Sequence, residues 1–165
     1  MEKQREKLLK KNSQVIYALN DLCFGMHGHL SALLKDFNYF LYFRKQSDDE
    51  MSNLYLQSLS FDLKKIVGIC NLIWGLGGHC KVIEYRNNKV DYYKIKGNCK
   101  VGKTQAILDS ISSQNILLNN YFRAKEGFEN QKVNVVLEKQ IDETKKQVCC
   151  LNAKMQEGGL KIVNN

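Results

Sequence analysis

The stretch FDLKKIVGICNLIWGLGG, residues 61–78, has the character of a buried helix that ends at paired glycines. It carries Asp62 and Lys65 three residues apart, so both side chains lie on one face of the helix. Charged groups are costly inside a protein unless a partner compensates them. The stretch therefore predicts a helix with charges on its buried face, and the rest of the chain must supply what compensates them.

The composition predicts a single globular domain over residues 1–165. Hydrophobic residues make up 44% of the chain and charged residues 25%, which is ordinary for a protein with one packed core. The net charge of +8 allows an acidic partner such as nucleic acid, but the lysines are scattered along the whole chain. No apolar run approaches the about 20 residues of a membrane span, and the first residues lack a signal peptide's apolar core. We therefore expect a cytoplasmic protein without a membrane partner.

The cysteines and the aromatic residues give weaker signals. None of the six cysteines belongs to a CxxC pair, so no zinc ribbon is indicated. Cys23, Cys70 and Cys149 are expected in the core. For His79, Cys80 and Cys99 the alternative is a metal site formed across a hairpin. Trp74 is expected to pack, together with Tyr85, Tyr92 and Tyr93; a contact surface is the alternative.

Apolar residues spaced three and four apart predict four long helices. The first spans about 5–45, and the second spans about 49–75, with Ser47 and Glu50 as a capping box and Gly77–Gly78 as its end. The third spans about 104–126, capped by Thr104, and the fourth spans about 130–156, stopped by Gly158–Gly159. The stripe of the first helix comprises Val15, Leu19, Leu22, Met26, His29, Leu33 and Phe40.

The connection over residues 77–103 is much longer than the other two. Its alternating, β-branched and aromatic character predicts a small β-hairpin with a turn at Asn87–Asn88. Short connections make the flanking helices antiparallel neighbours, whereas the long one lets the third helix begin at the opposite end. The chain is therefore predicted to be an all-α four-helix bundle with one crossover, as in ferritin-like folds.

Four segments carry a resemblance to a known family. They are LNDLCFGMHGHLSALL, FDLKKIVGICNLIWGLGG, ILDSISSQNILLNNYF and VVLEKQIDETKKQVCCL. They resemble the four helices of the ferritin-like superfamily, and most closely those of small rubrerythrin-type proteins of anaerobic bacteria, over most of the chain. In that family, four Glu and two His converge in the bundle core and hold two metal ions. Helices two and four each supply a Glu-x-x-His pair, whose members share one helix face.

This chain departs from the family at nearly every ligand position. The matching positions are His29 (or Met26, if the alignment slips by three), Asp62, Lys65, Gln114, Glu143 and Lys146. A lysine ammonium has three donors and no acceptor, so it cannot ligate a metal. The resemblance thus implies a degenerate site in which lysines and carboxylates pair with one another. Asp62 would pair with Lys65 or Lys146, and Glu143 would pair with the other lysine. We expect no metal and no other cofactor there; Fe or Mn would be the ion if one bound.

A second apolar stripe on each of two helices offers another placement of these charges. In the fourth helix, the stripe Leu137, Ile141, Thr144, Val148 and Leu151 would leave Glu143 and Lys146 at the margin of the core. In the second helix, the stripe Leu59, Leu63, Ile66, Cys70 and Ile73 would do the same for Asp62 and Lys65. Charges at such margins would be solvated.

The sequence favours a non-catalytic scaffold or interaction protein that self-associates, a pseudoenzyme with no catalytic residue. One alternative is an oxidoreductase or metal-storage protein that holds an ion through Asp62, Glu143 and His29. The other is a Dps-like protein that binds DNA without reading its sequence, through a basic arm. The arm comprises Lys3, Arg5, Lys7, Lys10 and Lys11.

Overall fold

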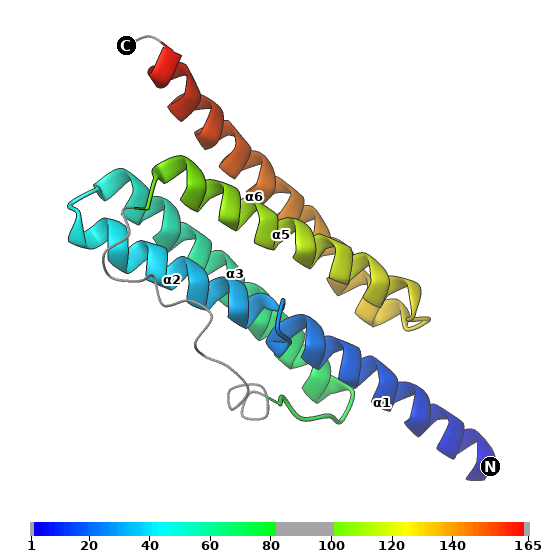
Figure 1. Ribbon diagram of the computed structural model, residues 1–165. Coiled ribbons are helices and arrows are strands. Elements are labelled where there is room, and N and C mark those ends of the chain that lie inside the picture. The colour runs from blue at the N-terminus through cyan, green and yellow to red at the C-terminus, as the bar shows by residue number, and fades with distance from the viewer. Residues whose placement is uncertain (1, 82–100, 164–165) are drawn as a thin grey trace.

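The computed structural model describes residues 2–81 and 101–163, which fold into helices without any strand (Figure 1). The helices are α1 (Glu2–Phe24), α2 (His29–Lys45), α3 (Asp49–Gly75), α5 (Lys103–Glu126) and α6 (Gln131–Val163). The all-α class is confirmed. The predicted β-hairpin falls almost entirely on residues outside the described ranges.

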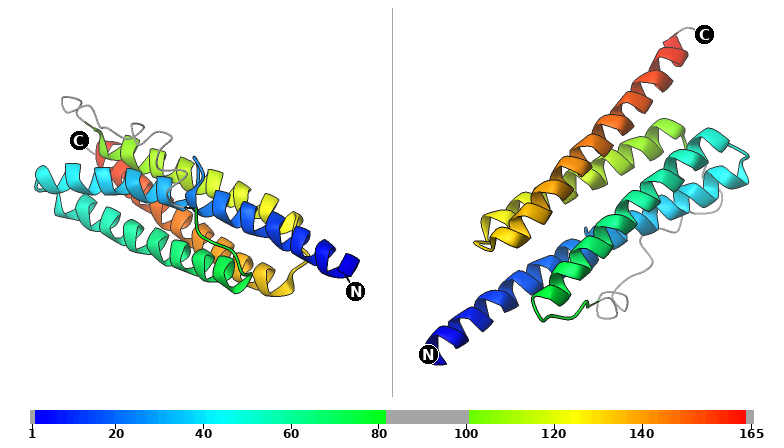
Figure 2. Two further views of the ribbon diagram at one scale, coloured as in Figure 1. Left: turned by 90° about the horizontal axis from the view of Figure 1, so that it is seen from below. Right: turned by 180° about the vertical axis from the view of Figure 1, so that it is seen from behind.

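The described helices form two antiparallel pairs that face each other. α2 pairs with α3, α5 pairs with α6, and α1 lies roughly end to end with α2, so four helical segments make up the bundle (Figures 1 and 2). α5 begins at the end of the bundle where α3 begins. An ion pair between Lys103 and Asp48 at 2.6 Å shows this placement. Val101 N also donates to the Tyr42 hydroxyl at 3.0 Å. The predicted crossover is therefore confirmed.

The first helix is not continuous, and its prediction over residues 5–45 is wrong. The chain turns at residues 25–28, where Gly28 N donates to Gly25 O at 2.9 Å. A Cβ on Gly25 would lie 2.4 Å from Asp21 O, and one on Gly28 would lie 2.9 Å from Leu22 O, so both positions require glycine. The break rotates the predicted stripe out of register, and Met26 is 63% exposed.

Three predicted helix ends are also corrected. Asp48, not Ser47, caps α3, with its Oδ1 accepting from Met51 N at 3.1 Å. α5 begins at Lys103 after Gly102, so Thr104 is not its cap. α6 continues through Gly158–Gly159 to Val163, because a glycine within a helix costs only about 1 kcal/mol and does not forbid the conformation.

Two helices end in the same way, but with different residues at the left-handed position. After α3, Gly77 has φ 78° and Gly78 N donates to Ile73 O. After α2, Ser47 has φ 56° and Asp48 N donates to Phe43 O. Both ends are Schellman motifs, in which glycine is normally favoured because its left-handed conformation carries no Cβ penalty.

We therefore expect Ser47→Gly to raise the free energy of unfolding by about 1 kcal/mol. Gly77→Ala should lower it by a similar amount, since a Cβ there meets nothing within 4 Å and only the backbone conformation is penalised. Urea unfolding followed by circular dichroism measures both changes. Ser60→Gly, at an exposed position inside α3, is the matched control and should be destabilising. A lower free energy of unfolding in Ser47→Gly would contradict the assignment of Ser47 to the left-handed position of a Schellman motif.

The side chain of Asn20 fastens the chain that leaves α3 against α1. Asn20 is fully buried; its Nδ2 donates to His79 O at 3.1 Å, and its Oδ1 accepts from Lys81 N at 2.8 Å. Both hydrogen bonds go to backbone groups, so they hold the path of residues 79–81 whatever side chains stand there. The start of the crossover is thereby fixed beside α1.

The core consists of two apolar clusters with a polar layer between them. One cluster gathers residues of α1, the start of α2, the C-terminal half of α3, and α5 and α6 with the turn that joins them: Val15, Leu19, Leu22, Cys23, Phe24, Ala32, Ile69, Cys70, Ile73, Leu117, Tyr121, Phe128, Val133, Leu137 and Ile141. The other gathers residues at the opposite end: Tyr39, Phe43, Met51, Tyr55, Ala106, Ile107, Ile111 and Leu151. The buried polar residues between them form the layer described below.

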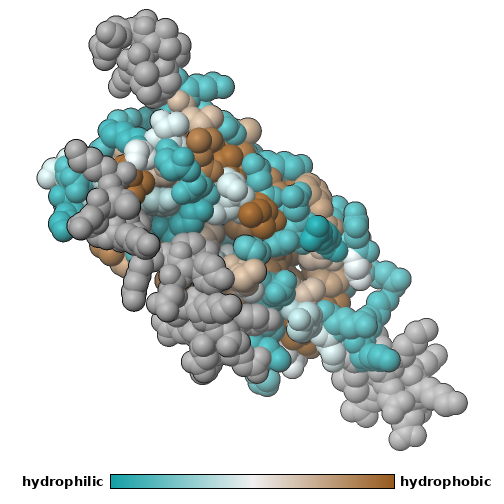
Figure 3. Space-filling view, in the orientation of Figure 1, coloured by the Kyte–Doolittle hydropathy of each residue, from teal (hydrophilic) through white to brown (hydrophobic). Residues whose placement is uncertain are grey.

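The surface is mixed in character. On the face shown in Figure 3, hydrophilic side chains predominate and hydrophobic ones form separate small patches. Cys149, which the sequence assigned to the core, is exposed, and so is Trp74 at 59%. Across the described residues, we find no helix that combines the length and the apolar character needed to cross a membrane.

Candidate functional site

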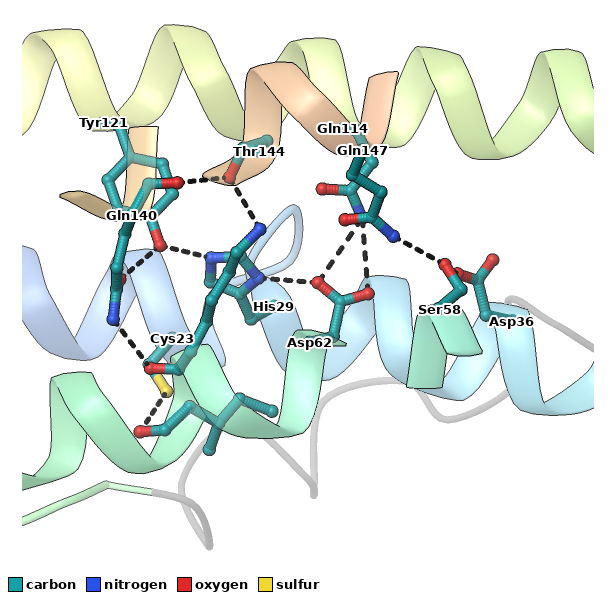
Figure 4. A network of polar contacts seen from close by, with 12 residues as sticks. Cys23, His29, Asp36, Ser58, Asp62, Gln114, Tyr121, Gln140, Thr144 and Gln147 are labelled. Atoms are coloured by element: carbon teal, nitrogen blue, oxygen red, sulfur yellow. Dashed lines mark hydrogen bonds and ion pairs between the residues drawn. The ribbon is translucent and has the colours of Figure 1, made fainter. Parts of the chain in front are cut away.

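A layer of hydrogen-bonded side chains fills the centre of the bundle (Figure 4). α2 supplies His29 and Asp36; α3 supplies Ser58, Asp62 and Lys65; α5 supplies Ser110, Gln114 and Tyr121; α6 supplies Gln140, Thr144 and Gln147. On each helix these residues recur at helical spacings, so they lie on the face that meets the other helices. The layer therefore draws on all four segments of the bundle.

Asp62 is fully buried and its carboxylate accepts hydrogen bonds from two other helices. His29 Nδ1 lies 2.9 Å from Asp62 Oδ1. Gln114 Nε2 donates to both oxygens, at 3.4 Å to Oδ1 and 3.2 Å to Oδ2. The charge on the buried face of residues 61–78 is thus compensated by an imidazole and an amide.

The second nitrogen of His29 continues the network. His29 Nε2 lies 2.6 Å from the Tyr121 hydroxyl, which lies 2.5 Å from Gln140 Oε1. Gln140 Nε2 donates to the backbone carbonyl of Lys65 at 3.3 Å, so its Oε1 faces Tyr121 as an acceptor. Tyr121 then donates to Gln140, and His29 Nε2 must donate to Tyr121.

This direction of donation fixes the charge of the His29–Asp62 pair. Because Nε2 carries a proton, the contact between Nδ1 and Asp62 Oδ1 requires a second proton, which the two atoms share. Burial lowers the pKa of His29, and the hydrogen bond to Asp62 opposes that shift. Whether this proton is closer to nitrogen or to oxygen, the pair has no net charge. A neutral pair needs no external cation.

Lys65 lies next to this pair and is almost sealed from solvent, at 1% exposure. Its Nζ donates to Thr144 Oγ1 at 2.6 Å and lies 3.6 Å from the centre of the Phe61 ring, a cation–π contact. Within the described part of the chain it forms no ion pair with Asp62 or Glu143. Burial lowers the pKa of Lys65 to about 7, although both carboxylates favour its charged form.

Asp36 is the second buried carboxylic acid of the layer. Its two oxygens accept from Ser58 Oγ at 2.7 Å and Ser110 Oγ at 2.9 Å. Gln147 Nε2 in turn donates to Ser58 Oγ at 2.7 Å, which ties α6 to the same group. Burial raises the pKa of Asp36 to about 6, and the two serine hydrogen bonds oppose that shift. Asp36 is therefore held by hydroxyls rather than by a cation.

The structure brings four of the six predicted positions together, and separates the other two from them. His29, Asp62, Lys65 and Gln114 are buried in the layer. Glu143 is only half-buried and Lys146 is exposed, because α6 turns a different face toward the core. The predicted ion pairs of Asp62 with Lys65 or Lys146 are wrong, since Asp62 accepts from His29 and Gln114 instead.

The alternative stripes have opposite outcomes on the two helices. On α6, Leu137, Ile141, Thr144 and Leu151 are buried, so that stripe is confirmed. On α3, Leu63 is 54% exposed whereas Asp62 and Lys65 are buried, so the second stripe is wrong.

Several residues of the layer were not singled out from the sequence. The most central are Asp36, Tyr121 and Gln140, with Ser58, Ser110 and Gln147 around them, whereas Thr144 was predicted only as a member of the apolar stripe. Spacing could have found those on α5 and α6, because the intervals within Ser110–Gln114–Tyr121 and Gln140–Thr144–Gln147 are three, four or seven residues.

The donor set does not fit the pair of metal ions that the resemblance implies. Among residues 2–81 and 101–163, no group of three or more His, Cys, Asp or Glu side chains is placed to hold a metal. The oxygens of Asp36 and Asp62 already accept from protein donors, and an ammonium lies close by. Within that same part of the chain, the buried acceptors without a partner are amide oxygens, such as Gln114 Oε1.

The fold and the layer together define an all-α helical bundle with a hydrogen-bonded polar centre. Comparison of the chain with protein families, with curated proteins and with solved structures finds no match. The function is therefore argued from the residues of the bundle themselves.

Proposed function

We propose that this protein is a metal-free, ferritin-like bundle that acts as a non-catalytic scaffold or interaction protein in the cytoplasm. The observation that carries the proposal is the state of the two core carboxylates. Every oxygen of Asp36 and Asp62 accepts a hydrogen bond from a protein side chain. A metal ion that bound these carboxylates would have to compete with those protein donors for the same oxygens.

The charges of the layer support the same proposal. Two divalent ions carry four positive charges and need about as many carboxylates around them in a medium of low dielectric. Here His29 and Asp62 form a neutral pair, and Lys65 in its ammonium form adds a positive charge and has no lone pair to offer a metal. An added ion would meet repulsion instead of compensation. Side chains of this kind serve to hold the helices together.

The metal-storage or oxidoreductase alternative requires Asp62, His29 and Glu143 to share an ion. His29 and Asp62 are engaged with each other at 2.9 Å, and Glu143 is only half-buried on α6. No observation favours this alternative, nor the DNA-binding one, over the scaffold. A scaffold acts through its surface, and a homo-oligomer is the simplest assembly that such a surface would serve.

The proposal predicts that the purified protein contains no stoichiometric iron, manganese or zinc after growth in supplemented medium. Elemental analysis should give well below one ion per chain, and adding these metals or EDTA should leave the midpoint of thermal unfolding unchanged. Asp62→Asn is the matched variant, and should show the same lack of metal. A stoichiometric ion in the wild type that Asp62→Asn loses would overturn the proposal in favour of the metal protein.

A further inference from the structure

Four large apolar side chains of α3 are exposed in one straight line. They are Leu56 at 52%, Leu63 at 54%, Val67 at 52% and Trp74 at 59% exposure. Their intervals of seven, four and seven residues keep them within about 20° of a single line along the helix, because each residue turns the helix by about 100°. The line extends over about 27 Å at 1.5 Å per residue.

The surroundings of this stripe carry almost no charge. The other exposed residues of α3 between positions 53 and 74 are Asn53, Gln57, Ser60, Lys64 and Asn71, of which Lys64 alone is charged. By contrast, α6 exposes Lys132, Glu138, Lys139, Asp142, Lys145 and Lys146. An exposed apolar line that charges avoid is typical of a protein–protein contact rather than of a solvated face.

The spacing of the residues in this stripe is symmetric. Its intervals are the same when read from Leu56 to Trp74 and from Trp74 to Leu56, so the pattern is symmetric about position 65. A twofold axis at that position would set Leu56 of one copy opposite Trp74 of the other, and Leu63 opposite Val67. Every residue of the stripe then has an apolar partner, as an isologous contact requires.

We propose that α3 packs antiparallel against α3 of a second copy of this chain about such a twofold axis. The exposed residues along one side of the stripe are uncharged apart from Lys64. Their amides and one hydroxyl can hydrogen-bond across the axis. This contact deepens the proposed function by naming the partner as the chain itself and α3 as the surface.

The first test measures the mass of the full chain by sedimentation equilibrium over a range of concentrations. The wild type should be a dimer at micromolar concentration, and Leu63→Glu should weaken the dimer by roughly 100-fold or more, since the twofold axis removes two apolar contacts at once. Val135→Glu on α6, where Val135 is 59% exposed but lies off the stripe, should leave the dimer intact. Circular dichroism checks that both variants keep the wild-type helix content.

The second test examines the antiparallel register. Leu56→Glu and Trp74→Lys should each weaken the dimer, and the double variant Leu56→Glu/Trp74→Lys should recover much of the loss, because the new charges face each other across the axis. In a parallel pair, like charges would meet and no recovery would occur. Trp74 is the single tryptophan, so its emission should also shift to the red when the wild type is diluted to a monomer.

Two outcomes would overturn this inference: a wild type that remains monomeric at about 100 μM, or a dimer that is as sensitive to Val135→Glu as to Leu63→Glu. Lack of recovery in the double variant would overturn the antiparallel pairing. None of these outcomes bears on metal content, so failure of the α3 contact is distinguishable from failure of the metal-free core, which elemental analysis decides.

Discussion

Lys65→Met is expected to raise the free energy of unfolding at and below neutral pH by about 1–4 kcal/mol. Methionine keeps the apolar stem of the side chain and removes a buried ammonium that has one hydrogen-bond acceptor, Thr144 Oγ1, within the described residues. Thr144 remains satisfied after the change, because its hydroxyl donates to Gln140 O at 2.7 Å. The main cost that disappears is the desolvation of the charge.

The gain should depend on pH with a definite sign. In the folded protein the pKa of Lys65 is about 7, compared with 10.5 in the unfolded chain. Between these values the unfolded chain binds more protons, so wild-type stability rises with pH by up to about 1.4 kcal/mol per unit from this residue. The advantage of Lys65→Met is therefore fully present below about pH 7 and vanishes as the pH approaches 10.5.

Urea unfolding of both proteins at several pH values measures this difference. Lys64→Met is the matched control, because Lys64 is the neighbouring lysine and is exposed, so its replacement should change stability by less than about 0.5 kcal/mol. If Lys65→Met were less stable than the wild type at every pH, the ammonium would be a net stabiliser of the core, and the description of its environment would be wrong.

Asp62→Ala is expected to lower the free energy of unfolding by about 3–5 kcal/mol. The change removes the acceptor of His29 Nδ1 and of Gln114 Nε2 at once, and both donors lie in residues that are at most 1% exposed. Buried donors without acceptors incur their full desolvation cost. The unpaired imidazole would also lose the group that shares its proton, so the contact with Tyr121 would have to rearrange.

Denaturant unfolding with two comparison variants separates this effect from simple loss of a carboxylate. Asp142→Ala removes an exposed carboxylate from α6 and should be nearly neutral. Asp62→Asn retains an acceptor oxygen for His29 and should cost less than Asp62→Ala, about 1–2 kcal/mol. Equal stability of Asp62→Ala and Asp142→Ala would show that the His29–Asp62–Gln114 contacts contribute nothing.

The sequence predicted the extent of α3 over residues 49–75, because its apolar period is regular and its flanks contain turn residues. It failed at residues 25–28, since the apolar spacing continues through Leu22, Met26 and His29 as if the helix were unbroken. The break depends on a close approach of Gly25 and Gly28 to the preceding turn. That approach is a backbone contact, which a side-chain pattern does not record.

Of the positions predicted for the site, those on α2, α3 and α5 lie in the polar layer, whereas the two on α6 do not. Asp62 and Lys65 on α3, and Glu143 and Lys146 on α6, have the same spacing and similar chemistry in the sequence, yet Lys65 is buried and Lys146 is exposed. The difference comes from the rotation of each helix about its axis, which the packing of whole helices decides. Local spacing defines the stripes of a helix, but it does not select which stripe faces inward.

The division of the core into two apolar ends and a polar centre bears on how the helices are aligned. Apolar contacts alone tolerate an axial shift of one helix against another, because two apolar surfaces pack almost as well after a shift of one helical turn, 5.4 Å. Directional bonds such as Tyr121 to Gln140 and Lys65 to Thr144 would all break in such a shift. The central layer thus acts as a gauge for axial position: it discriminates against misaligned bundles even where it adds little to the strength of the aligned one.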